Sequence, residues 1–338
     1  TQFDRDPRET QQRIDEEYLR LTREALRDPG EIRMIVWPES MSVVPLIKAD
    51  KDGWLPASEI ADWKIVTPEE AVSLERAKRL PQVVYQLQKY SADSFAKLVQ
   101  SLRQIRNATT DESFVLVLGT EVEHYRAGKI DRYNSSLALG EEGQIEGRYD
   151  KMHLVMFGEY VPLGGLIPAL YDWTPLMGGL TPGAQATIYE VADCRFAPSI
   201  CYETVLPHVI RRQLLELEGR QESPDVLLSQ TNDGWFWGSS ALDMHLICGI
   251  FRAVEFRTPL LIAANTGLSA SIDGRGRVVA LGPRRESEVL LVAPHLEPLQ
   301  SVYLKVGDIL GGGCAVFVVF TGLWALFSRR KMDGAGRE

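Results

Sequence analysis

Cysteine is scarce in this sequence and never stands in a metal-binding or disulfide-forming spacing. There is no C-x-x-C pair, and no histidine lies at ligand spacing from a cysteine. We therefore expect no metal site, no disulfide framework and no cofactor. The cysteines are Cys194, Cys201, Cys248 and Cys314.

Basic residues are also too few for nucleic acid to be an expected partner. The chain has 37 Lys and Arg against 46 Asp and Glu, a net charge of −9, and no basic stripe. A signal peptide and an initial methionine are lacking too, so we interpret the chain as an excerpt of a longer protein. Its 338 residues can hold one large α/β domain or two small ones, and we expect a monomer.

One stretch departs from this mixed composition. From Ile309 to Phe327 there are nineteen residues without a charge, and three cations follow at 329–331. A helix of this length spans about 28 Å, close to the hydrocarbon thickness of a bilayer. The alternative is a buried core helix, which rarely ends in such a basic cluster. We predict a transmembrane helix over residues 306–328 and, from the positive-inside rule, a cytoplasmic tail over residues 329–338.

Strand-like and helix-like patterns alternate along the rest of the chain, which is typical of the α/β fold class. The polar stretch from Lys48 to Pro81 has no strong pattern, and we predict a surface excursion there. The expected strands are Ile32–Val36, Phe114–Gly119, Tyr133–Leu139, Ile145–Tyr149, Val226–Leu228, Leu260–Ala264, Ser269–Ile272 and Val278–Leu281. The expected helices are Asp6–Arg27, Gln82–Ile105, Val205–Leu217 and Ser239–Arg257.

Cys201 occupies a position that favours reactivity. It ends an apolar run and precedes the helical stretch that begins near Val205, so we expect its thiol at a sharp turn from a strand into a helix. The positive end of a helix dipole and unpaired backbone N–H groups both favour the thiolate, the nucleophilic form. The alternative is a buried structural cysteine, the commoner role of an isolated cysteine. A base and an oxyanion-stabilising cation elsewhere in the chain would favour the reactive role over the structural one.

Two charged residues stand in similar positions after other strands. Glu39 follows the strand that ends at Val36, and Lys151 follows the strand that ends at Tyr149. Open α/β folds place their chemistry at such strand ends. Each residue alone is weak support, because a glutamate after a strand is commonly solvated and a lysine in an apolar loop commonly snorkels. Together with Cys201, however, they are what acyl transfer needs.

Two loops carry large apolar side chains among polar residues. Trp235, Phe236 and Trp237 follow the strand that ends at Leu228, and Met156 and Phe157 lie in the apolar loop after Lys151. Such residues indicate a surface that faces a substrate or a membrane. The alternative is that they pack on the core.

Taken in order, these motifs resemble the nitrilase superfamily, and more narrowly the apolipoprotein N-acyltransferase family. The resemblance covers nearly the whole chain and ends in the apolar stretch described above. It implies a four-layer α-β-β-α sandwich. The motifs that carry it are WPES at 37–40, HLV at 153–155, FGEYVP at 157–162, ICYE at 200–203, TNDGWF at 231–236, RAVE at 252–255 and NTG at 265–267.

The resemblance also implies roles for individual residues. Glu39 would be the general base, Lys151 the cation that supports an oxyanion, and Cys201 the nucleophile. Glu159 would be an additional active-site carboxylate. The supporting residues implied with less specific motifs are Tyr202, Glu203 and Asn134.

The activity implied is N-acylation of the N-terminal diacylglyceryl-cysteine of bacterial lipoproteins. The acyl chain would come from a phospholipid through a thioester on Cys201. The partners would then be the phospholipid, the apolipoprotein and the inner membrane, with the catalytic domain on the periplasmic face. Two alternatives are an amidase- or nitrilase-type carbon-nitrogen hydrolase, which needs no membrane anchor, and a non-catalytic, membrane-tethered binding module.

The chain departs from the family pattern in several places. The family's N-terminal membrane spans are lacking, and we expect residues 1–305 to form the catalytic domain with its first strand missing upstream of Asp6. Met156 stands where a proline is usual, and Trp237 looks inserted after Trp235 and Phe236. These departures concern the entry of substrate more than the chemistry.

Overall fold

A computed structural model describes residues 7–40, 42, 44–54, 80–108, 112–127, 129–164, 166–174, 179–236, 238–297 and 300–335. Its strands form two sheets. In the first sheet β3 lies between β4 on one side and both β1 and β2 on the other, and β5 pairs with β4. Both β1 and β2 run parallel to β3, whereas β4 and β5 are antiparallel to their neighbours. The strands are β1 (Met34–Val36), β2 (Leu46–Trp54), β3 (Val115–Ala127), β4 (Lys129–Leu139) and β5 (Ile145–Asp150).

The second sheet has the order β11-β10-β9-β8-β7-β6. Its central strands β7, β8 and β9 are parallel, so their carboxyl ends meet at one edge. The strands are β6 (Tyr189–Val191), β7 (Cys194–Ile200), β8 (Val226–Asn232), β9 (Leu260–Asn265), β10 (Ala270–Ile272) and β11 (Val278–Leu281).

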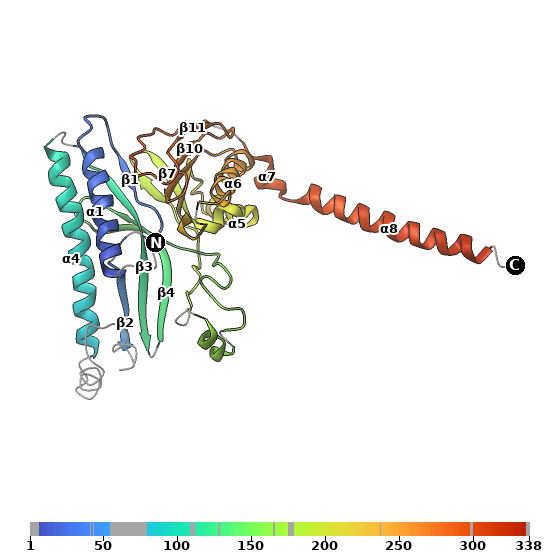
Figure 1. Ribbon diagram of the computed structural model, residues 1–338, viewed down its shortest axis with the longest axis horizontal. Coiled ribbons are helices and arrows are strands. Elements are labelled where there is room, and N and C mark those ends of the chain that lie inside the picture. The colour runs from blue at the N-terminus through green and yellow to red at the C-terminus, as the bar shows by residue number, and fades with distance from the viewer. Residues whose placement is uncertain are drawn as a thin grey trace.

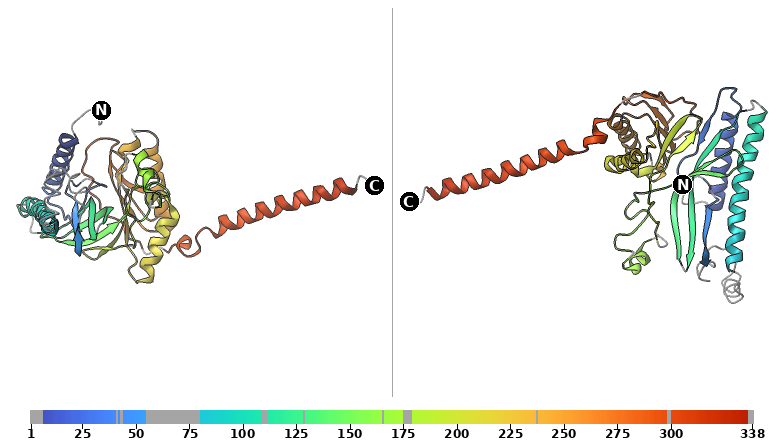
Figure 2. Two further views of the ribbon diagram at one scale, coloured as in Figure 1. Left: turned by 90° about the horizontal axis from the view of Figure 1, so that it is seen from below. Right: turned by 180° about the vertical axis from the view of Figure 1, so that it is seen from behind.

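Helices cover the outer face of each sheet (Figures 1 and 2). Helices α1 (Pro7–Ala25) and α4 (Leu80–Asn107) pack on the first sheet, and α5 (Pro207–Gly219), α6 (Ala241–Phe256) and α7 (Val302–Val306) pack on the second. Short 3₁₀ helices η1 (Pro168–Trp173), η2 (Cys201–Val205) and η3 (Asp233–Phe236) lie in the connections.

The order of layers follows from the alternation of side chains along the strands. In β3, Leu116 and Leu118 pack with the helices, whereas Val117 between them packs in the cluster that joins the two sheets. That central cluster also takes Tyr149 from the first sheet and Phe196 from the second. The expected four-layer α-β-β-α arrangement is therefore confirmed, and the two sheets face each other directly.

The expected strands and helices are found with shifted ends, but two parts differ from expectation. The surface excursion predicted over Lys48–Pro81 is wrong in its first part, because β2 continues to Trp54 and pairs with the far end of β3. The rest of that excursion, residues 55–79, lies outside the described residues. The hairpin of β6 and β7 around Ala192 was not predicted, since its first strand has only three residues.

Helix α8 (Ile309–Ala335) projects away from the sandwich (Figure 1). Its described side chains extend to Ala325, and the large apolar ones among them are exposed, from Ile309 to Trp324. No helix in the described part of the chain has both the length and the apolarity needed to cross a membrane.

Candidate active site

Glu39 is placed by the end of β1 and by a glycine on the neighbouring strand. After Val36 the chain stays attached to β3, because the Trp37 N–H donates to the Val117 carbonyl at 2.8 Å. It then crosses over Gly119, where a Cβ atom would lie 2.7 Å from the Glu39 Cα. Only glycine leaves room for this crossing. The crossing directs the Glu39 side chain into the space between the two sheets, where the carboxyl ends of β1 and β8 lie.

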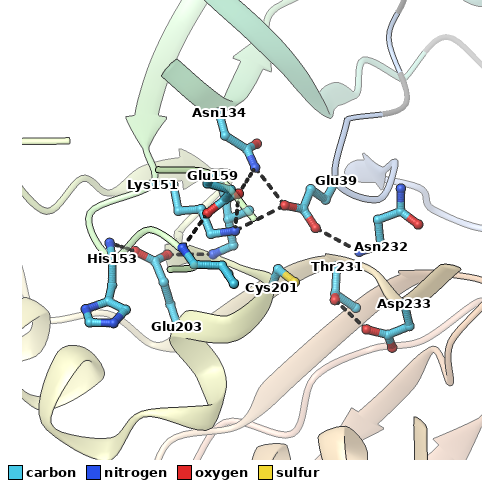
Figure 3. Close-up of polar contacts among 12 residues, drawn as sticks. Glu39, Asn134, Lys151, His153, Glu159, Cys201, Glu203, Thr231, Asn232 and Asp233 are labelled. Carbon is cyan, nitrogen blue, oxygen red and sulfur yellow. Dashed lines mark hydrogen bonds and ion pairs between the residues drawn. The ribbon is translucent and has the colours of Figure 1, made fainter. Parts of the chain in front are cut away.

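Lys151 follows β5 directly and is almost completely buried, with 1% of its surface exposed. Its backbone N–H donates to the Asn134 carbonyl at 2.9 Å. Its ammonium group donates to Glu159 Oε1 at 2.7 Å and to Glu39 Oε1 at 3.3 Å (Figure 3). Burial lowers the pKa of Lys151, but Glu39, Cys201 and Glu159 together raise it above its ordinary value. The group is therefore a fixed cation.

Asn134 and Glu159 complete this charged group. The Asn134 side-chain amide donates to Glu39 Oε1 at 2.7 Å and to Glu159 Oε1 at 3.2 Å. The second oxygen of Glu159 accepts from the Val155 N–H at 2.8 Å. One lysine and one amide thus hold both carboxylates in place.

Glu39 also connects the two sheets. Its Oε2 accepts from the backbone N–H of Asn232, at the end of β8, at 2.9 Å. The amide of Gln230 in the same strand donates to the Trp37 carbonyl beside Glu39. The carboxyl ends of β1 and β8 are therefore joined at the site.

Cys201 stands at the end of β7 and begins η2, with a left-handed φ of 52°. Figure 3 places the side chain of Cys201 between Lys151 and Thr231. The charges of Glu39 and Lys151 and the hydroxyl of Thr231 all act on the pKa of its thiol. Burial and the negative charge of Glu39 raise the pKa of the thiol to about 12, against the opposing effect of Lys151. The expectation that this turn favours the thiolate is therefore wrong for the resting site. The reason is that the thiol is desolvated beside a carboxylate, and the long helix α5 begins only at Pro207.

Glu203 holds the Lys151 segment and the Cys201 turn together. It is fully buried, and burial raises its pKa. Its Oε1 accepts from the backbone N–H groups of Met152 and His153 at 2.7 and 2.9 Å, and its Oε2 from the N–H of Ile200 at 2.7 Å. The Tyr149 hydroxyl donates to the same carboxylate at 2.8 Å. With this many donors, Glu203 positions the backbone on both sides of the site.

The remaining expected residues lie at the surface near the site. Tyr202 is exposed, with its ring 6.3 Å from that of His153, outside the charged group. Met156, Phe157 and Phe236 are exposed, and their role in facing a substrate or a membrane stays a prediction. Trp237 and the side chain of Trp235 lie outside the described residues.

Sequence reasoning missed four contributors to the site. Thr231, Asn232 and Asp233 were quoted only as part of a motif, and His245 in α6 was not singled out. The Asp233 carboxylate accepts from the Thr231 hydroxyl at 2.9 Å and lies 2.8 Å from the His245 ring. The polar run after β8 was the available signal. In the described residues no cluster of three or more His, Cys, Asp or Glu side chains could hold a metal ion.

A separate cleft of about 1690 Å³ opens beside β1, between α1 and the segment around Leu291. None of Glu39, Lys151 and Cys201 lines it. The polar group between the sheets is therefore separate from this cleft.

A family model described as carbon-nitrogen hydrolase matches residues 9–303. An apolipoprotein N-acyltransferase of Geobacter metallireducens is 34% identical over 215 residues, which are 64% of this chain and 40% of that protein. One of Rhodopirellula baltica is 29% identical over 284 residues, 82% of this chain and 48% of that protein. The chain thus spans less than half the length of these relatives. In fold, it is similar to a carbon-nitrogen hydrolase of Helicobacter pylori G27, with a TM-score of 0.50 at 13% identity over 82% of each chain.

Proposed function

The chain belongs to the carbon-nitrogen hydrolase family, and we propose that it performs the acyl transfer of an apolipoprotein N-acyltransferase. An acyl chain passes from a phospholipid to the Cys201 sulfur, and from there to the N-terminal diacylglyceryl-cysteine of a bacterial lipoprotein. The observation that carries the proposal is the buried ammonium of Lys151, held 3.3 Å from Glu39 and within electrostatic reach of the thiol. The names of the two curated relatives supply the substrate class.

The first half-reaction forms the thioester. The Cys201 sulfur attacks the ester carbonyl of the phospholipid while Glu39 takes the thiol proton. Because burial and the charge of Glu39 raise the pKa of the resting thiol, the proton leaves for Glu39 as the bond to carbon forms. Lys151 offsets the negative charge on the tetrahedral oxygen. The ester C–O bond then breaks, and Glu39 returns the proton to the departing lysophospholipid.

The second half-reaction releases the acyl chain as an amide. The amino group of the acceptor cysteine attacks the thioester carbonyl, and Glu39 removes the proton that the nitrogen loses. The C–S bond breaks, and the sulfur recovers its proton from Glu39. Water that reached the thioester would hydrolyse it, so the site has to exclude water between the two steps.

Exposed apolar side chains in the segment after Lys151 support a lipid substrate. We call this set the apolar rim. It extends from Met156 through the loop to η1, where Trp173 is 87% exposed. Exposed apolar side chains gathered in one segment are typical of a binding or membrane-facing region. Its members are Met156, Phe157, Leu163, Leu166, Ile167 and Trp173.

The proposal includes a membrane anchor over residues 306–328. The stretch from Ile309 to Phe327 carries no charge and precedes the cations at 329–331. The exposed apolar side chains of α8 support the same assignment. The catalytic domain then lies on the periplasmic face of the inner membrane and the tail over residues 329–338 in the cytoplasm.

Incubation of the membrane-bound protein with phospholipid labelled in its acyl chain tests the reaction. The transferase is expected to give a stable acyl-protein that hydroxylamine cleaves, and to release label as amide when a diacylglyceryl-cysteine peptide is added. Rapid release of free fatty acid without acceptor would instead identify a hydrolase. Binding of phospholipid with neither product would identify a binding module.

The anchor has its own measurement. We expect the chain to stay with membranes after carbonate extraction, and a version truncated after Val306 to be released. If the truncated protein resisted extraction as well, the apolar rim and not α8 would hold it to the membrane.

A further inference from the structure

Cys201 is held at its sulfur and at its backbone carbonyl by one connected group of side chains. The sulfur contacts the Thr231 hydroxyl, which donates to Asp233 Oδ1 at 2.9 Å. The same carboxylate oxygen lies 2.8 Å from Nδ1 of His245, and Nε2 of that ring lies 3.3 Å from the Cys201 carbonyl oxygen. A carbonyl oxygen can only accept, so the hydrogen bond to Cys201 requires a proton on Nε2.

His245 lies in α6, which fastens both ends of η2. At the start of η2 the acceptor is the Cys201 carbonyl, and at its end the Val205 carbonyl accepts from Arg252 at 3.2 Å. His245 and Arg252 are both nearly fully buried. The φ angle of Cys201 is 52°, a backbone conformation that residues other than glycine rarely adopt. The turn therefore needs hydrogen bonds from outside η2 to hold it.

The carbonyl of Cys201 and the N–H of Tyr202 belong to the same peptide plane. No described peptide bond is cis, so the two groups point in opposite directions. A hydrogen bond that holds the carbonyl toward α6 therefore turns the Tyr202 N–H away from α6. Helix α6 packs on one face of the second sheet, and the first sheet, which is followed by Lys151, packs on the opposite face (Figure 2). As the second residue of a 3₁₀ helix, Tyr202 has no partner for this N–H within the helix.

We propose that His245, held by Asp233, is a positioning residue that aims the Tyr202 N–H at the oxyanion formed on Cys201. This inference rests on the proposed acyl transfer, and what it adds is the hydrogen bond from His245 that fixes the direction of this N–H. Lys151 then stabilises the tetrahedral oxygen by charge, and the Tyr202 N–H does so by a hydrogen bond whose direction His245 fixes. Loss of one such donor costs about a hundredfold or more in other enzymes, and misdirection of it costs less.

Two amide substitutions separate the two hydrogen bonds of His245. A glutamine can place its amide near the position of Nε2, so His245→Gln keeps a donor for the Cys201 carbonyl. An asparagine reaches only the position of Nδ1, so His245→Asn keeps the contact to Asp233 but loses the hydrogen bond to the Cys201 carbonyl. His208→Leu serves as the control. It also removes a histidine, but His208 lies in α5, near the ring of His153 at 6.2 Å, and does not belong to the group that holds Cys201.

The experiment compares two reactions of the same sulfur in the membrane-bound protein. One is acyl-protein formation from labelled phospholipid, which passes through an oxyanion, and the other is alkylation by iodoacetamide, which does not. We expect His245→Asn to lower kcat of acylation at least about tenfold with KM unchanged, and to change alkylation less than about threefold. His245→Gln is expected to retain most of the acylation rate, and His208→Leu all of it.

Other outcomes overturn the inference. If His245→Asn and His245→Gln acylate equally well, the carbonyl contact has no role in the oxyanion site. If acylation and alkylation fall in parallel, His245 only maintains the fold around Cys201. If the unmodified protein gives no acyl-protein, the proposed function itself fails, which is a distinct result from either of these.

Discussion

The two walls of the site are built from different kinds of interaction. The first-sheet wall, Glu39, Asn134, Lys151 and Glu159, is a group of charges joined by hydrogen bonds of 2.7 to 3.3 Å. The second-sheet wall, Cys201, Thr231, Asp233 and His245, presents a neutral thiol whose pKa is raised to about 12. In the proposed mechanism, the base and the cation are thus held in place before the nucleophile is ionised.

Under the proposed mechanism, this difference explains how a buried cysteine can react without being a thiolate at rest. A permanent thiolate beside Glu39 would place two negative charges together in a poorly solvated site, which is unfavourable. Keeping the thiol neutral removes that cost, and Glu39 stays free to accept the proton during the attack. Lys151 forms ion pairs with both carboxylates of the first-sheet wall, Glu39 and Glu159. It keeps its positive charge and can stabilise the negative oxygen of the tetrahedral intermediate.

The largest effect is expected from removing the nucleophile of the second-sheet wall. Cys201→Ala should lower acyl-protein formation by at least about 10³-fold, because no covalent intermediate can form. The first-sheet wall should stay intact, so we expect a thermal midpoint close to that of the unmodified protein. Cys194→Ala is the matched control and should acylate normally. Acyl label retained by Cys201→Ala would place the nucleophile at another cysteine.

Substitutions in the first-sheet wall should move the Cys201 thiol in opposite directions. The carboxylate of Glu39 disfavours the thiolate and the ammonium of Lys151 favours it. Glu39→Gln should therefore lower the thiol pKa, and Lys151→Met should raise it. The measurement is the alkylation rate against pH: the profile moves to lower pH for Glu39→Gln, and Lys151→Met reacts more slowly at every accessible pH. Shifts in one common direction would contradict the charges assigned to this wall.

The strand-end positions of Glu39, Lys151 and Cys201 could be predicted from the sequence, whereas the contacts of Thr231, Asp233 and His245 could not. Glu39 and Lys151 follow strands that are recognisable as apolar runs, and strand ends gather at one edge of a sheet. His245 lies inside a helix, where nothing local marks the face that meets Cys201. Its role depends on how α6 packs against η2, which is a long-range contact. The raised pKa of Cys201 was missed for the same reason, because burial between two sheets is not visible in the turn's own residues.

The carboxylate of Glu203 joins the two walls, and its loss should have an intermediate effect. Glu203→Gln replaces one accepting oxygen by a donor that faces backbone N–H groups from Ile200 or from Met152 and His153. We expect a loss of about 1 to 3 kcal/mol in the free energy of unfolding, measured by urea denaturation. Glu190→Gln, on an exposed position of β6, is the control and should change little. Equal stability of the two variants would mean that the walls are held by the central apolar cluster alone.

The smallest effect is expected from a neutral group beside the nucleophile, the Thr231 hydroxyl. The Thr231 hydroxyl favours the Cys201 thiolate by hydrogen bonding, but it also donates to Asp233 at 2.9 Å and so divides one proton between two acceptors. Thr231→Val removes that donor and should slow alkylation at fixed pH by no more than about tenfold, the worth of one ordinary hydrogen bond. Thr231→Ser keeps the hydroxyl and should react at nearly the original rate. A larger effect of Thr231→Val than of Lys151→Met would reverse the comparison. The second-sheet wall, and not the charges opposite it, would then control the nucleophile.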